Sequence, residues 1–325
     1  MHAEAPQGDG QASPSDLGIR GTRVQGTPQV GYLGPQGTFS EEALLAAAIP
    51  GAVEPVPFRS IYETVAALRR EEVRYSVVPI ENSLDGSISV TLDLLAAEEE
   101  PVKIVGEVLL AISHSLIAAE PVGLDEIETV ISHPQVPGQC ERFLRGELAH
   151  ARVLAAGSTA EAVRTVVSTG RRAQAALGTS LAARIYGGTV IRAGVQDRDD
   201  NETRFVWLAR DVKEGEQEGA GSAPPLRETT GDQWRTSIVF WGAGAERPGW
   251  LVRCLDEFAR RDINLTKIES RPRRERLGSY MFFADLAGRA KDTPVADAIA
   301  SMRALSADVR LLGSYRAAVP VALSS

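Results

Sequence analysis

Apolar positions follow a strand-like and a helix-like pattern in turn between Gln29 and Arg210. Short apolar, β-branched runs alternate there with segments whose apolar residues recur every three or four positions. The runs predict strands at Val30–Leu33, Tyr75–Ile80, Ile104–Ile112, Thr129–Ser132, Arg152–Ala155 and Phe205–Ala209. The segments between them predict helices at Glu41–Ala48, Ile61–Arg70, Ile88–Ala97, Gly138–Leu144 and Thr159–Ser168. This alternation predicts an α/β region with largely parallel strand pairing, built as one domain or as two lobes.

The pattern stops after Arg210 and resumes in a different order. Asp211–Gln233 contains Gly, Glu, Pro and Ser with almost no large apolar residue, which predicts a flexible linker. The remainder predicts strands at Thr236–Trp241, Ile263–Glu269, Tyr280–Leu286 and, as a short one, Val309–Gly313, with a helix opened by Pro248 and Gly249 and a second at Val295–Leu305. This β-α-β-β-α-β order is typical of ferredoxin-like domains. The predicted division is a tail at 1–28, a first domain at 29–210, a linker at 211–233 and a second domain at 234–320.

Composition narrows the class of protein. The chain has 325 residues, of which 43% are hydrophobic and 24% charged, and this indicates a globular protein with two or more domains. Its net charge of −8 is unlike that of a general nucleic-acid binder. The only two cysteines, Cys140 and Cys254, are too few and too far apart for a disulfide scaffold or a Cys-based zinc site.

The sequence also predicts where the protein resides. Met1–Pro28 is rich in Gly, Pro, Gln and Ser and lacks the apolar core of a secretory signal, so it reads as a disordered tail. No apolar run approaches the roughly 20 residues that a membrane span needs. We therefore expect a cytoplasmic protein with no membrane partner.

Four loops that follow predicted strands are rich in small hydroxyl, amide and glycine residues. They are Gly34–Ser40, Glu81–Ser87, Ser132–Gln135 with Gln139 shortly after, and Gly157–Thr159. Such loops present backbone N–H groups at helix N-termini, where an anion is favoured. Each one alone is more simply explained as a turn with a helix cap. Together they favour a ligand site, because ligands bind at the strand ends of α/β domains.

A fifth motif, Asn201-Glu202-Thr203-Arg204-Phe205, precedes the last strand of the first domain. Its first three residues also fit a glycosylation sequon, but that fit has no use without secretion. The segments GPQGTFS, VVPIENSLDGS, SHPQ with a later QC, and NETRF occur in this order across Gln29–Arg210. In this combination the chain resembles the prephenate dehydratase family.

The resemblance implies an activity: loss of the ring hydroxyl and ring carboxylate of prephenate, giving phenylpyruvate, water and carbon dioxide. Aromatisation drives this reaction, so the resemblance implies no metal, nucleophile or redox cofactor. It places Thr203 at the centre of catalysis. Because a threonine hydroxyl is a poor acid, it either transfers a proton in a step that needs little transfer or only hydrogen-bonds the leaving oxygen. The residues implied to bind substrate are Thr38, Asn82, Ser83, Ser132, Gln139, Ser158, Thr159 and Arg204.

Some of these roles have alternatives. Arg204 is either the counter-charge of a substrate carboxylate or a structural ion-pair partner. His133 is either a titrating base or a side chain fixed by local hydrogen bonds, which we favour. Glu81 fits a supporting position, and Gly157 stands where some relatives carry an acid.

The resemblance also implies a fold. The first domain would be a two-lobed catalytic domain like a periplasmic binding protein, with its site in the cleft between the lobes. The chain would cross to the second lobe at Lys103–Glu107 and return between Gly188 and Val206, which would place Thr203 near the hinge.

The C-terminal domain resembles the ACT domains attached to this enzyme. Asn264–Pro272 matches their ESRP-containing segment, and Gly249–Val252 stands where a GAL sequence is usual. In the family these segments meet across a subunit interface and enclose phenylalanine, which implies feedback inhibition and a homodimer or homotetramer. The implied effector-binding residues are Gly249, Trp250, Leu251, Val252, Asn264, Leu265, Glu269 and Ser270. Trp250 departs from the usual sequence, and it either packs on a neighbouring apolar patch or crowds the effector pocket.

Two other functions stay open at this point. An arogenate dehydratase would use the same residues on the amino-acid counterpart of prephenate. A non-catalytic module that binds anions or amino acids would share the two-lobed fold, as solute-binding proteins do.

Overall fold

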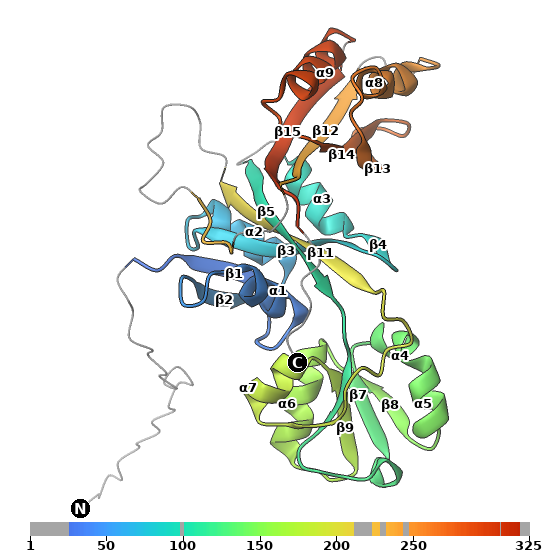
Figure 1. The fold of residues 1–325 in the computed structure, drawn as a ribbon. Helices are drawn as coiled ribbons and strands as arrows, with labels where there is room; N and C mark the ends of the chain where they lie inside the picture. Colours follow the sequence, from blue (N-terminus) through green and yellow to red (C-terminus); the bar gives the residue numbers. More distant parts are fainter. Residues whose placement is uncertain are drawn as a thin grey trace, which may run out of the picture.

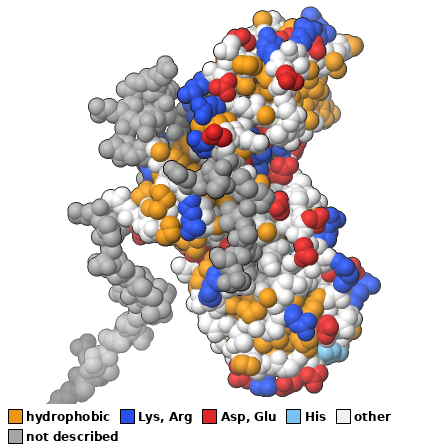
Figure 2. Space-filling view, viewed as in Figure 1, with side chains coloured by type: hydrophobic (Ala, Val, Ile, Leu, Met, Phe, Trp, Pro, Cys, Tyr) orange, Lys and Arg blue, Asp and Glu red, His pale blue; other side chains and the backbone are white. Residues whose placement is uncertain are grey.

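A computed structural model describes residues 26–97, 101–210, 223–227, 232–242, 247–305 and 307–318. Three α/β bodies lie in a row: a C-terminal domain, a first lobe in the middle and a second lobe at the other end (Figure 1). The space-filling view shows basic and acidic side chains close together where the C-terminal domain meets the first lobe (Figure 2). Within these residue ranges, no helix is long and apolar enough to span a membrane.

The first lobe carries the strands that hold the central motifs. Its strands are β1 (Gln29–Leu33), β2 (Glu54–Phe58), β3 (Tyr75–Asn82), β4 (Gly86–Ser87), β5 (Val102–Ala111) and β11 (Glu202–Arg210), and its helices are α1 (Phe39–Ala47), α2 (Ile61–Arg69) and α3 (Ser89–Ala96). β1 pairs in parallel with β2 and β3, whereas β11 lies antiparallel between β3 and β5. The prediction of largely parallel pairing is therefore wrong. β11 brings the chain back from the second lobe antiparallel to both of its neighbours, and in the second lobe the strand Ser115–Ala118 is antiparallel to Gln174–Gly178 and to Thr189–Arg192.

The second lobe is built around a separate five-stranded sheet in the order β10-β6-β9-β7-β8. Its elements are β6 (Ser115–Ala118), the 3-10 helix η1 (Leu124–Glu126), β7 (Thr129–Ser132), α4 (Val136–Gln139), α5 (Glu141–Glu147), β8 (Arg152–Ala155), α6 (Thr159–Thr169), β9 (Gln174–Gly178), α7 (Ser180–Tyr186) and β10 (Thr189–Arg192). The predicted two-lobed organisation is confirmed.

The chain crosses between the two lobes twice, and only the return crossing lies where it was predicted. The chain leaves the first lobe at residues 112–114. The predicted crossing at Lys103–Glu107 is wrong because β5 stays paired with β11 through this stretch and as far as Ala111, with one register shift between Ile104 and Gly106. The return runs through residues 193–201, inside the predicted interval.

The C-terminal domain has the predicted β-α-β-β-α-β order. It consists of β12 (Trp234–Gly242), α8 (Trp250–Ala259), β13 (Leu265–Pro272), β14 (Tyr280–Ala287), α9 (Thr293–Ala304) and β15 (Ala307–Arg316), with the strands ordered β13-β14-β12-β15. One face of this sheet packs on α8 and α9 through Ile238 and Phe240. On the other face, Val239 and Phe283 join the core of the first lobe.

Strand β15 joins the two domains into one sheet. It is ten residues long, longer than the predicted Val309–Gly313. Beyond the predicted end, Tyr315 reaches the core shared with the first lobe. Gly313 pairs in parallel with Ile104 of β5. A Cβ atom on Gly313 would lie 2.1 Å from the Ile104 carbonyl oxygen, so the contact requires glycine.

Part of the predicted linker packs on the first lobe. Residues 223–227 and 232–233 are its described portion. Leu226 forms an isolated bridge with Ala48 and packs with the apolar cluster around Trp207. The remaining linker residues, and residues 1–25 of the predicted tail, lie outside the described residues.

Candidate active site

The antiparallel pairing of β3 with β11 places Asn82 opposite Thr203. The Asn82 Nδ2 amide donates to Thr203 Oγ1 over 2.9 Å and to Asn201 Oδ1 over 2.8 Å. Its Oδ1 accepts from the backbone N–H groups of Leu84 and Asp85, both over 2.9 Å, so the direction of the carboxamide is fixed. Thr203 is only 8% exposed. Its hydroxyl oxygen accepts a hydrogen bond, while its own hydrogen has no acceptor among the described residues and can be given to a ligand.

The polar chain continues from Asn201 into the second lobe. Asn201 Nδ2 donates to Gln139 Oε1 over 3.2 Å, and His114 Nε2 lies 3.0 Å from the same oxygen. Because an amide oxygen only accepts, His114 must carry its hydrogen on Nε2. Burial lowers the pKa of His114, which keeps the ring neutral near pH 7. These contacts tie Gln139 of α4 to both crossings, and they leave its Nε2 amide pointing away from His114 and Asn201.

Two of the predicted anion-binding loops already hold a carboxylate from their own helix. Glu41 accepts from the Gly37 N–H over 2.5 Å, and Glu161 accepts from the Gly157 N–H over 3.0 Å. Thr38 donates its hydroxyl to the Leu33 carbonyl, and Ser158 caps α6 by accepting from the Glu161 N–H. The second of these loops is therefore a capped turn, whereas the first is held by its own Glu41 and Thr38 contacts without a side-chain cap.

The other hydroxyls predicted to bind substrate have different surroundings. Ser83 donates to the Asp200 carbonyl and accepts from the Glu202 N–H, so it fixes the entry into β11. Ser132, at the end of β7, is 1% exposed, and its hydroxyl has no partner in the described part of the chain. Thr159 is 9% exposed at the start of α6.

The two lobes touch beside the first of these loops. Thr179 donates to the Gly37 carbonyl over 2.6 Å, and Tyr186 donates to the Gln36 carbonyl over 2.8 Å. Gly37 has a φ of +85°, and a Cβ atom there would lie 2.8 Å from Ala182. The backbone of α7 can approach the loop only because this residue is glycine.

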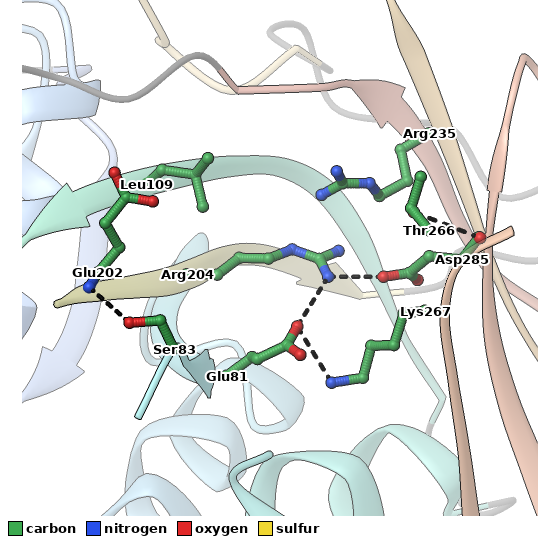
Figure 3. A pocket seen from close by; sticks show the side chains of 9 residues that line it. All are labelled: Glu81, Ser83, Leu109, Glu202, Arg204, Arg235, Thr266, Lys267 and Asp285. Carbon is green, nitrogen blue, oxygen red and sulfur yellow. Dashed lines mark hydrogen bonds and ion pairs between the residues drawn. The ribbon is translucent and has the colours of Figure 1, made fainter. Parts of the chain in front are cut away.

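Arg204 shares a pocket with Ser83 but bonds a different set of side chains from the other predicted substrate-binding residues. Its guanidinium bonds Glu107 of β5, Asp285 of β14 and Tyr315 of β15, at 2.6, 2.6 and 2.8 Å. Its side chain is 7% exposed. The close view shows it directed toward the C-terminal domain (Figure 3). Of the two expectations for Arg204, the structure shows the ion-pair partner.

The predicted effector-binding residues lie around α8 and β13. Trp250 is 2% exposed and packs with Phe240 and Phe282, so it faces the apolar interior of its own domain. Gly249 precedes α8 with a φ of +77°. Val252 is exposed, Leu251 is half-buried, and the remaining four, which lie in or directly before β13, are Asn264, Leu265, Glu269 and Ser270.

Sequence reasoning missed His114, Asn201 and Thr179 as members of this site. Asn201 belonged to a recognised motif, and its position two residues before Thr203 was a usable signal. A single histidine after a strand and a threonine before a short helix carry no such signal.

Comparison with known proteins agrees with these motifs. The family model described as prephenate dehydratase matches residues 30–213. The prephenate dehydratase of Mycobacterium sp. (strain JLS) is 40% identical over 298 residues, covering 89% of this chain and 89% of that protein. The one from Amycolatopsis methanolica is 39% identical over 296 residues, covering 90% of each. The crystal structure of prephenate dehydratase from Arthrobacter aurescens in complex with L-Phe has a TM-score of 0.76 and 32% identity, covering 91% of this chain and 93% of that one. The chain belongs to the prephenate dehydratase family.

Proposed function

We propose that this protein is a carbon-oxygen lyase that converts prephenate to phenylpyruvate, water and carbon dioxide. The observation that carries the proposal is the Asn82–Thr203 pair, in which an amide N–H donates to a hydroxyl oxygen whose own hydrogen is free. A departing hydroxide needs a hydrogen-bond donor of this kind. The family membership supplies the substrate.

The pair can assist the reaction without a strong acid. As the ring C–CO2− bond breaks, its electrons enter the ring and the C–OH bond breaks, so the carboxylate leaves as carbon dioxide and the hydroxyl as hydroxide. The hydroxide takes up one proton, ultimately from solvent, to become water. This proton either passes through the Thr203 hydroxyl or reaches the hydroxide while Thr203 only hydrogen-bonds it. The Asn82 amide stabilises negative charge that develops on Thr203 Oγ1. Donors positioned in this way typically contribute about 10²- to 10³-fold in rate.

The Gln139 amide is a second group that can meet the substrate. Its oxygen is held by Asn201 and His114, so its N–H groups remain to donate to a carboxylate or carbonyl. The hydrogen bond from Thr179 to the Gly37 carbonyl holds the two lobes together beside the site. Such lobe contact helps to keep water away from the reacting groups.

We also propose that the C-terminal domain is an ACT domain that binds phenylalanine and inhibits the enzyme. The L-Phe complex of the Arthrobacter relative supports this proposal, as does the Asn264–Pro272 segment on β13. In this segment Arg271 donates to Asp93 and Ser89 of α3, so the strand touches the catalytic part directly. If saturating phenylalanine changes neither turnover nor prephenate affinity, this part of the proposal fails. We further propose a homodimer or homotetramer, which light scattering of the purified protein would distinguish from a monomer.

Turnover of the purified protein tests the catalytic proposal. Phenylpyruvate formation from prephenate should be readily measured, and kcat/KM for arogenate measured in parallel should be lower. A protein that binds prephenate without turnover would instead be a binding module, and a higher kcat/KM for arogenate would identify an arogenate dehydratase.

A further inference from the structure

Both residues of the proposed catalytic pair have a neighbour that faces the C-terminal domain. Thr203 pairs with Asn82 across β11 and β3, and the next pair along the same two strands is Arg204 with Glu81. Successive side chains of a strand point to opposite faces of the sheet, so Arg204 and Glu81 point to the face opposite Asn82 and Thr203. The register of β11 against β3 also shifts immediately after Arg204.

Arg204 is held mostly by the C-terminal domain. Asp285 and Tyr315, which bond its two terminal nitrogens, belong to β14 and β15. Ser237 of β12 supports both partners, at 2.5 Å from Asp285 Oδ1 and 2.7 Å from the Tyr315 hydroxyl. Glu107 is completely buried and shared with Arg235 of β12, so two guanidinium groups face two carboxylates. Removing one partner of such a buried ion pair leaves the charge of the other partner uncompensated.

Glu81 is held by the same domain through a different strand. Lys267 of β13 places its Nζ 3.1 Å from Glu81 Oε2 and 2.5 Å from the Ser87 hydroxyl. Arg204 Nη1 lies 3.6 Å from the same Glu81 oxygen, which joins the two contacts into one network. Lys267 is 9% exposed although it lies on the edge strand of the sheet.

A polar cavity of about 270 Å³ lies among these side chains, and Glu81, Arg204, Lys267 and Asp285 line it (Figure 3). The space lets Lys267 or Glu81 move without displacing an apolar core. The ion pair between Lys267 and Glu81 can therefore change while both domains stay folded. A connection that relays effector binding to the Asn82–Thr203 pair requires such freedom.

We propose that Lys267, Asp285 and Tyr315 of the C-terminal domain are positioning residues for the reaction. By holding Glu81 and Arg204, they fix β3 against β11 and so set the distance between Asn82 Nδ2 and Thr203 Oγ1. The inference rests on the proposed function of that pair. Through Lys267, it also connects β13, where three of the implied effector residues lie, directly to the strands of the catalytic pair.

Lys267→Met and Tyr315→Phe test the proposal, because each removes a polar contact and keeps most of the side chain's bulk. We expect kcat to fall about tenfold or more, since small displacements of reacting groups are costly, while KM for prephenate changes less than about twofold. Lys267→Arg, which retains the charge opposite Glu81, should recover most of kcat. The matched controls are Lys291→Met and Tyr62→Phe, whose side chains are exposed.

A readout independent of activity separates this inference from the proposed function. Hydrogen exchange of the 201–206 backbone should be faster in Lys267→Met and Tyr315→Phe than in the wild type and in both controls. Wild-type kcat together with wild-type exchange in both variants would overturn the inference. A wild-type protein that does not convert prephenate would overturn the proposed function alone, because the exchange measurement still decides the positioning role.

Discussion

Asn82 is the residue on which the proposed active site depends most. Its single carboxamide bonds Thr203, Asn201 and the turn at Leu84, so one side chain joins β3, the return crossing and β11. Its orientation is determined by the two backbone donors on its oxygen. As a result Thr203 receives an N–H and not an oxygen from Asn82, which keeps the threonine hydrogen available for a ligand.

His114 gives this site a dependence on pH that can be measured. Burial lowers its pKa in the folded state below the ordinary value of about 6.5. As the pH falls through about 6.5, the unfolded chain therefore binds more protons than the folded protein. The free energy of unfolding consequently decreases over this pH range.

We predict that His114→Gln makes the unfolding free energy less dependent on pH between 7 and 5. Urea unfolding at several pH values would measure this, with the exposed His150→Gln as the matched control. An unchanged pH dependence in His114→Gln, or an equal loss in the control, would contradict the assignment.

At the scale of elements, the sequence was most informative where apolar runs are long. β3 and β5 were predicted in nearly their full length because each is a mostly apolar segment that becomes a central strand. For β11 only Phe205–Ala209 was predicted, because its first three residues are polar or charged. β2 was missed because Pro55 and Pro57 interrupt its run, and proline is tolerated there only because β2 is an edge strand. The other missed elements, all of them short, are β4, β6, η1, β9, α7 and β10.

The site was predictable only as a set of motifs. Asn82 and Thr203 are 121 residues apart, and no local pattern shows that they pair. The position of Gln139 relative to His114 depends on where the chain crosses between lobes, and that crossing was predicted wrongly. Arg204 was ambiguous for a related reason: its partners Asp285 and Tyr315 come from a domain whose docking leaves no trace in the sequence around Arg204.

The loop at Gly37 allows a prediction about lobe closure. Gly37→Ala should raise KM for prephenate and lower kcat/KM by about tenfold, because the added methyl group would push α7 away from the loop. Gly51→Ala is the matched control, since Gly51 also has a positive φ, of +75°, but has open space around its Cβ position. Steady-state kinetics would compare them. Equal effects of the two substitutions would show that backbone strain, not lobe contact, is responsible.

At the scale of the whole molecule, the catalytic and C-terminal domains share one ten-stranded sheet and one apolar core. The C-terminal domain covers its second sheet face with the first lobe, as Val239, Phe283 and Leu312 show. The two domains are therefore expected to unfold together, although the sequence between them reads as a linker.

We predict that Gly313→Ala separates this unfolding into two transitions. Its methyl group would collide with the Ile104 carbonyl and force β15 away from β5. Differential scanning calorimetry would show the separation, with Gly146→Ala as a control in a helix with open space around it. One undivided transition in Gly313→Ala, at the wild-type temperature, would contradict a cooperative role for this contact.

The most direct test of the account is the kcat of Thr203→Val compared with Thr203→Ser. Valine has nearly the shape of threonine but no hydroxyl, whereas serine retains the group that accepts from Asn82 and donates to the leaving oxygen. We predict that Thr203→Val lowers kcat by about 10²- to 10³-fold while prephenate still binds, and that Thr203→Ser keeps most of the activity. A Thr203→Val variant with kcat close to that of the wild type would contradict the central role of this hydroxyl.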